Sequence, residues 1–172
     1  MIMKQLFAFI LCAAALCAAA APLAIPMPFK KGAKSPIDGW QGKGTLVTLE
    51  KDSAVALNPL STIQYGKQFP GKSGDKVVYE ITLKRNSDFV SLRLGQWSKE
   101  GWIGDNFVLL KGDKEFTVAK GEIVLKDADK PDKAGIVRKV ERFDVRIYAH
   151  SNSKDVVIKD VKLTLVPGEN KK

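Results

Sequence analysis

Cysteine and histidine are almost absent from this chain of 172 residues. Its two cysteines, Cys12 and Cys17, both lie in an apolar run near the N-terminus, and His150 is the one histidine in the sequence. No Gly-x-Ser-x-Gly segment occurs either. Beyond the N-terminal run, the sequence therefore offers no disulfide, no cysteine nucleophile, no three-histidine zinc site and no serine-hydrolase elbow.

The N-terminal run has the features of a secretory signal peptide. Lys4 supplies a positive charge, residues 6–20 are apolar without interruption, and the run ends in small residues. At about fifteen residues, this segment is shorter than the ~20 that cross a bilayer. We predict a signal peptide over 1–20, cleaved after Ala20. The protein is then secreted, periplasmic or on the cell surface, with no transmembrane segment in the mature chain.

Acidic residues are outnumbered by basic ones. The formal net charge is +9, with 28 Lys plus Arg against 19 Asp plus Glu. The lysines are scattered along the sequence rather than grouped in one run, which is typical of a solvated surface. Outside a cell, such a charge attracts anionic envelope components such as acidic polysaccharides through a field that salt screens. We expect no nucleic acid as partner.

Composition divides the chain into four parts. Residues 21–38 contain four prolines among lysines and show no periodicity, which indicates a linker or an extended arm. Residues 39–168, roughly 130 in number, are enough for one domain with a real core. Residues 169–172 form a polar tail.

Helical periodicity is missing from the domain, whereas short alternating stretches recur between Gly, Asp, Asn and Pro residues. This pattern predicts an all-β fold, a two-sheet antiparallel β-sandwich (jelly roll), preceded by the cleaved signal peptide. The expected strands are residues 44–50, 54–58, 61–65, 76–85, 89–97, 115–118, 121–125, 142–150 and 156–166.

Alternation within three of these strands assigns their faces. The inward residues are Val77, Tyr79, Ile81 and Leu83, then Val90, Leu92 and Leu94, then Phe143, Val145, Ile147 and Ala149. The outward side chains include Arg93, Trp97, Arg146 and Tyr148. Aromatic rings stack on the apolar face of a pyranose, and guanidinium groups donate to hydroxyls, so this face suits a sugar. The alternative is that these long side chains pack only on one another.

Residues 95–106, with three glycines and two tryptophans, read as a loop or a bent strand. Such a segment at the rim of a sandwich can form a ligand platform, whose contacts would be Gln96, Trp97 and Trp102. Alternatively, one of the two rings covers the open end of the core. Trp40, which precedes the first strand, is expected to pack.

Three short motifs carry a resemblance to a known family. They are a Gly-Trp pair at 39–40, a Gly-Lys-x-Gly-Asp-x-x-x-Tyr segment at 71–79, and an Ile-x-Asp-Val-x-Leu segment at 158–163. The chain resembles the carbohydrate-binding modules of the jelly-roll, galactose-binding-like superfamily, of the kind attached to xylanases and other glycanases. The resemblance implies binding of a polysaccharide or oligosaccharide through aromatic residues, which by position are Trp97, Trp102 and Tyr148.

The sequence departs from this family where calcium is concerned. Modules of this kind often hold a structural calcium ion with acids of the first and last strands, but here Lys159 stands beside Asp160 and the opening motif is missing. A lysine opposes a cation that needs six to eight oxygens. This argues against a calcium site, and we predict no cofactor and no metal.

Two functions from different classes remain. One is a secreted, non-catalytic carbohydrate-binding protein that uses the aromatic and arginine face. The other is a structural or interaction protein of the periplasm or cell envelope, held to anionic surfaces by its positive charge. A glycosidase would need two paired carboxylates. The candidate acids sit mostly beside Lys, Arg or Gly and read as solvated, so we predict no enzyme; they are Asp88, Glu100, Asp105, Asp144 and Asp160.

Overall fold

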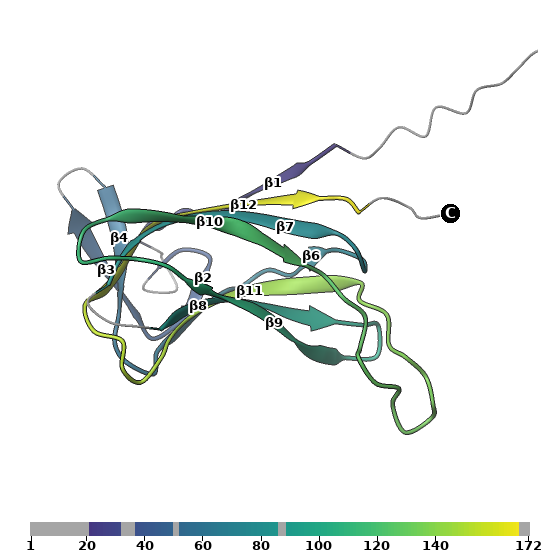
Figure 1. Cartoon of the computed structure of the whole chain (residues 1–172). Coiled ribbons are helices and arrows are strands. Elements are labelled where there is room, and N and C mark those ends of the chain that lie inside the picture. Colours follow the sequence, from purple (N-terminus) through teal and green to yellow (C-terminus); the bar gives the residue numbers. More distant parts are fainter. Residues whose placement is uncertain (1–20, 32–36, 50–51, 86–88, 169–172) are drawn as a thin grey trace, which may run out of the picture.

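Two antiparallel sheets, packed face to face, make up the computed structural model of the chain (Figure 1). The structure describes residues 21–31, 37–49, 52–85 and 89–168, so the predicted signal peptide and polar tail lie outside it. The predicted all-β sandwich is confirmed. No helix in the described ranges is long and apolar enough to cross a membrane.

The first sheet, called here the β7 sheet, has the strand order β10-β7-β12-β4-β3, and β1 also pairs with β12. Its strands are β1 (Leu23–Pro26), β3 (Gly44–Leu49), β4 (Asp52–Leu57), β7 (Lys76–Lys84), β10 (Thr117–Val124) and β12 (Val156–Val166). The second, the β8 sheet, has the order β2-β5-β11-β8-β9, and β6 also pairs with β11. Its strands are β2 (Trp40–Gly42), β5 (Thr62–Tyr65), β6 (Phe69–Pro70), β8 (Val90–Trp97), β9 (Trp102–Leu110) and β11 (Arg142–Ala149).

The core lies between the two sheets and follows the predicted alternation. All eleven side chains assigned inward on β7, β8 and β11 are buried, and Ile81, Leu92 and Phe143 are fully enclosed. Each such side chain contributes about 1.5–3 kcal/mol by leaving water. One consequence of this placement is that the alternate residues of β8 and β11 must face outward.

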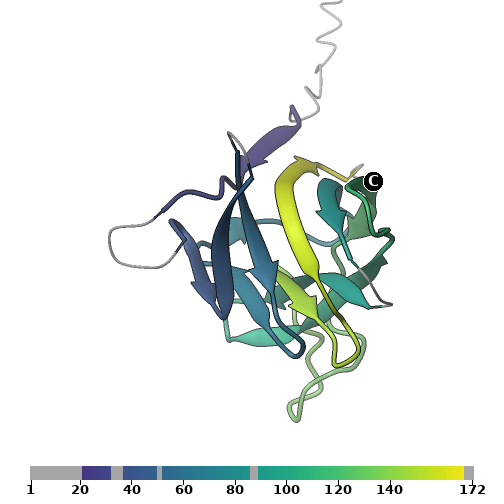
Figure 2. The same ribbon diagram turned by 90° about the vertical axis from the view of Figure 1, so that its left-hand side faces the viewer.

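The linker prediction for residues 21–38 needs correction. Leu23–Pro26 forms β1 and pairs with β12 (Figure 2). Ile25 and Met27 are each 2% exposed, and the ring of Phe29 lies 5.3 Å from that of Trp40, which is buried as expected. The domain thus begins well before residue 39, because these apolar residues alternate into the core despite the neighbouring prolines and lysines.

The loop or bent strand predicted over 95–106 is also corrected. β8 continues to Trp97, a tight turn follows, and β9 starts at Trp102. In the turn, the Ser98 N–H donates to the Gly101 carbonyl at 2.8 Å, and Gly101 has a φ of +145°, where glycine is favoured. Likewise, the two strands expected over 115–125 are one continuous strand, β10.

Candidate functional site

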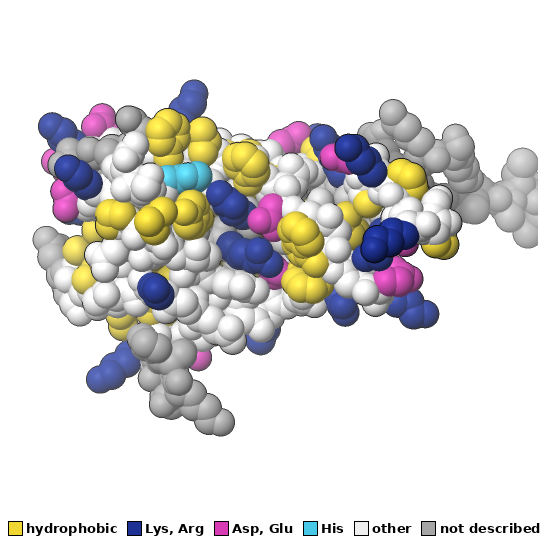
Figure 3. All heavy atoms as spheres, turned by 90° about the horizontal axis from the view of Figure 1, so that it is seen from below, with side chains coloured by type: hydrophobic (Ala, Val, Ile, Leu, Met, Phe, Trp, Pro, Cys, Tyr) yellow, Lys and Arg dark blue, Asp and Glu magenta, His cyan; other side chains and the backbone are white. Residues whose placement is uncertain are grey.

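The predicted aromatic and arginine side chains meet on one face. β8 and β11 are hydrogen-bonded neighbours whose register sets Arg93 opposite Arg146 and Ser91 opposite Tyr148. Paired residues of neighbouring strands point to the same side of a sheet. The view from below shows basic side chains at the middle of this face, flanked by hydrophobic groups, with the histidine beside one of them (Figure 3). We call this surface the β8 face.

Asp144 is the centre of the β8 face. It is 0% exposed, although it is a carboxylate on the outer side of β11. Its Oδ2 accepts hydrogen bonds from Trp97 Nε1 at 2.8 Å and from Arg146 Nη2 at 2.9 Å, and its Oδ1 lies 2.7 Å from Arg146 Nε. A Cβ added at Gly95, which pairs with Asp144, would lie 2.7–2.9 Å from these same groups. The glycine therefore makes room for the ion pair.

A second carboxylate joins the network from the edge strand β9. Asp105 Oδ1 lies 3.4 Å from Arg146 Nη1, and its Oδ2 lies 3.9 Å from Arg93 Nη1. Two arginines and two aspartates thus balance in formal charge. Because Asp144 holds the Arg146 guanidinium through two short contacts, that guanidinium has a fixed direction and needs no further ordering when a ligand binds.

Aromatic groups surround Arg93 on the other side of this network. Its guanidinium carbon lies 4.7 Å from the ring centroid of Tyr148 and 5.4 Å from that of Phe107, distances typical of cation–π contacts. The rings of Tyr148 and His150 are 4.6 Å apart. Phe107 is 53% exposed, so part of this aromatic group is open to a ligand.

His150 is joined to Arg93 through a serine. Arg93 Nε donates to Ser91 Oγ at 3.1 Å, and Ser91 Oγ lies 3.3 Å from His150 Nε2. Burial, and then the positive charge of Arg93, lower the pKa of His150 below its ordinary value of 6.5. The hydrogen bond between Ser91 Oγ and His150 Nε2, whose direction is set by the imidazole tautomer, orients both groups.

Trp97 and Trp102 form the opposite end of the β8 face. They pair with each other across β8 and β9, where a bulge shifts the register, and Trp102 is 51% exposed. Trp97 is half-buried and tied to Asp144. At about 3.3 Å per strand residue, the tryptophans lie roughly 20 Å from Tyr148. The face therefore has an aromatic group at each end and the ion network between them.

Gln96 does not belong to this face. It alternates with Trp97, so it points between the sheets, where it is 5% exposed and its Oε1 accepts the Lys126 N–H at 2.8 Å. Its assignment as a ligand contact is therefore corrected. The neighbouring Asp144, expected to be a solvated surface acid, is instead enclosed by Trp97 and Arg146.

Sequence reasoning missed the contribution of β9. Asp105, Phe107 and Leu109 pair with Gly95, Arg93 and Ser91 and so extend the face by one strand. The signal for this strand is the alternation of residues after Gly104. The Gly-Asp-Asn sequence at 104–106 is typical of a turn and therefore hid the strand.

The Arg146 guanidinium contacts both Asp105 and Asp144, so the two carboxylates share one cation. The described ranges contain no group of three or more His, Cys, Asp or Glu side chains that could hold a metal ion.

No family model matches the sequence, and comparison with curated proteins gives no match. Among solved structures, the chain is similar to the enzymatically active domain of tailspike protein 4 of bacteriophage CBA120. The TM-score is 0.50 and the identity 9%, over 75% of this chain and 20% of that one. The similar part is thus one fifth of the tailspike chain, and at this identity it shows the fold alone.

Carbohydrate-binding modules are also among the similar structures. One is the C-terminal CBM6 of LamC, a laminarinase from Zobellia galactanivorans, with a TM-score of 0.45 and 12% identity over 84% of this chain and 99% of that one. Another is the xylan-binding module CBM15, with a TM-score of 0.47 and 14% identity over 87% and 100% of the two chains.

Proposed function

We propose that this protein binds a polysaccharide or oligosaccharide on the β8 face. The observation that carries the proposal is the buried Asp144, which fixes Trp97 and Arg146 at once. Fold similarity does not establish function, so the proposal is based on the side chains of this face.

The face supplies both kinds of contact that sugars use. The exposed rings of Trp102 and Phe107 can stack on the C–H face of a pyranose. Arg93 and Arg146 present guanidinium donors that are already paired with carboxylates. The distance of roughly 20 Å between the two aromatic ends suits a chain of several sugar units that runs along the strands.

The proposed role is binding without catalysis, outside the cell. Arg146 between the two carboxylates supports the absence of hydrolysis. The apolar run over 1–20 supports export, and the scattered lysines give no support to a nucleic-acid partner. In this proposal the protein works at the cell surface, in the periplasm or in the medium.

A glycan array probed at low and high salt tests the proposal. We expect binding to a defined set of glycans that persists at high salt, because stacking is not screened. Trp102→Ala should lower this affinity roughly tenfold. Val118→Ala is the matched control, since Val118 is 48% exposed on the β7 sheet. Equal affinity of the two variants would refute the site. Binding only to acidic glycans, with an affinity that falls as the salt concentration rises, would favour the alternative function, a structural or interaction protein of the cell envelope that its positive charge holds to anionic surfaces.

A further inference from the structure

A pair of adjoining hollows lies where β4 and β7 end and β12 begins. The larger, about 550 Å³, is bounded by the end of β4, the start of β12 and the last residue of β7. The smaller, about 320 Å³, is bounded by Lys84, Arg85, Lys114 and Asp155. Lys84 and Asp155 line both hollows, so the two adjoin each other. We call the pair the Lys84 recess.

Basic side chains dominate the walls of the Lys84 recess. Its described lining contains four of them, Lys84, Arg85, Lys114 and Lys154, against the single acid Asp155. Ion pairs elsewhere on the β7 sheet join lysines to acids at about 3 Å, as with Lys159 and Asp52. Among the described residues, by contrast, neither Lys84 nor Lys114 has a carboxylate within 4 Å. Their charges are therefore available to a ligand.

The floor of the recess is small and apolar. Val157 pairs with Lys84 on one side and with Ala56 on the other, so these three side chains form one row across the sheet. Because the side chains of Ala56 and Val157 are short, the surface is hollow above them. Lys84 lies beside them, and its Nζ is 5.3 Å from the Phe116 ring centroid. The cation is thus held at the wall by an aromatic ring.

The position of Arg85 is set by its backbone and by a glycine. Its N–H donates to the Asp113 carbonyl at 2.8 Å, and a Cβ added at Gly112 would lie 3.1 Å from its Nε. Gly112 thereby provides the space along which the guanidinium lies. The ammonium groups of Lys84 and Lys114, beside this guanidinium, are donors of the kind that bind oxyanions.

We propose that the Lys84 recess binds a sulfate or phosphate group carried by an anionic polysaccharide. The basic side chains surround a recess rather than cover a flat patch, which suits a single substituent on a chain better than a planar lipid surface. The site lies on the β7 sheet and is independent of the β8 face.

Titration with inorganic sulfate and inorganic phosphate, followed by backbone amide NMR, tests the location. The largest shifts are expected at Lys84, Lys114 and Val157. Binding of dextran sulfate is then measured for Lys84→Gln and for the double variant Lys114→Gln/Lys154→Gln, whose positions 114 and 154 are exposed. Each should lose about tenfold in affinity. The charge-matched control is Lys67→Gln/Lys130→Gln, which should bind like the unchanged protein.

Three results would overturn the proposal. Equal losses in the two double variants would mean that net charge alone attracts the polymer. Shifts spread over the whole surface would mean that no discrete site exists. Binding to phosphatidylglycerol vesicles without binding to dextran sulfate would assign the basic residues to a lipid surface. An unchanged thermal midpoint in every variant confirms that losses of affinity do not come from unfolding. Neutral glycans that bind the β8 face should bind every variant with the affinity of the unchanged protein.

Discussion

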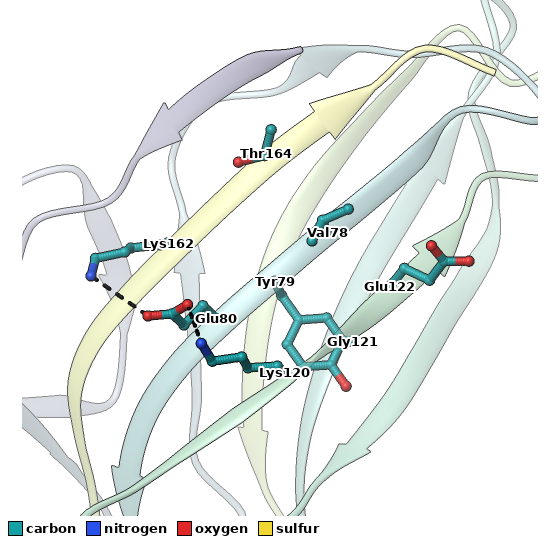
Figure 4. Close-up of a pocket in the computed structure, with 8 residues that line it drawn as sticks. All are labelled: Val78, Tyr79, Glu80, Lys120, Gly121, Glu122, Lys162 and Thr164. Atoms are coloured by element: carbon teal, nitrogen blue, oxygen red, sulfur yellow. Dashed lines mark ion pairs between the residues drawn. The ribbon is translucent and has the colours of Figure 1, made fainter.

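On the outer face of the β7 sheet the ion pairs are exposed to water, whereas on the β8 face the carboxylate of the Asp144–Arg146 pair is buried beside Trp97. In the first case, Lys120 and Lys162 reach Glu80 from the neighbouring strands across a shallow groove of about 440 Å³ (Figure 4). The Glu80 side chain is 39% exposed and the two lysines 66%. In the second case, the Asp144 side chain is 1% exposed and that of Arg146 22%.

The two arrangements differ in what they cost. Exposed pairs contribute little, because water screens the charges and two long side chains must be ordered. Enclosing a carboxylate and a guanidinium carries a desolvation penalty comparable with the energy of their attraction. Stability alone therefore does not explain the network around Asp144. Its effect is to hold Trp97 and Arg146 in one geometry, which is what a binding surface requires.

The largest expected effect comes from breaking the enclosed network. Asp144→Ala leaves the Arg146 charge and Trp97 Nε1 without their buried acceptor, so we expect a loss of about 3 kcal/mol in the free energy of unfolding. Glu122→Ala, which removes the partner of Lys76 on the β7 sheet, should change it by less than about 0.5 kcal/mol. Urea unfolding measures both values. Similar losses would show that the two faces do not differ as described.

Tyr148→Ala compares the β8 face with the β7 sheet through their contributions to ligand binding. The substitution removes a ring that contacts Arg93 and His150, so glycan affinity should fall roughly tenfold, with the fold retained. Isothermal titration with a glycan selected on the array measures the change. The corresponding alanine at Val78, 39% exposed on the outer face of the β7 sheet, should leave affinity unaltered. A loss at both positions would mean that the ligand does not discriminate between the faces.

The pH dependence of stability gives a smaller difference. Since burial and Arg93 lower the pKa of His150 in the folded state, the unfolded chain takes up its proton first as pH falls. The contribution of His150 is therefore present above 6.5 and is lost as pH falls from there through the folded-state pKa. His150→Gln should remove this part of the pH dependence. Parallel stability curves for the variant and the unchanged protein would disprove the assignment.

The smallest effect is expected on the β7 sheet. A hydrogen bond from Lys120 lowers the pKa of Glu80, but both side chains are solvated. Lys120→Gln should leave the thermal midpoint unchanged at every salt concentration, because the pair is screened by water already. A clear decrease at low salt alone would show that the exposed pairs stabilise the fold after all.

Much of the fold could be predicted from the alternation of apolar and polar residues, because this period of two, which buries Val77 and Ile81, is a local property of the sequence. The outward position of Arg93, Trp97, Arg146 and Tyr148 follows from the same rule. That β8 and β11 are neighbours does not, since pairing between distant strands depends on the whole chain.

The burial of Asp144 could not be predicted from the sequence either. Alternation correctly places it on the outer side of β11, where an acid is usually solvated. Its burial depends on Trp97 arriving from β8 and on Arg146 folding back over it. β9 was missed for a local reason: Gly104 and the following Asp105 and Asn106 resemble a turn, although they continue a strand whose alternate residues complete the face.

β1 pairs with β12, so the first and last described strands of the molecule are joined side by side. A chain made from its N-terminus must therefore keep Ile25 without its partner Leu163 until almost everything else has been synthesised. Contacts between such distant segments close slowly. The sandwich is therefore completed by the pairing of two strands, β1 and β12, that are synthesised at opposite ends of translation.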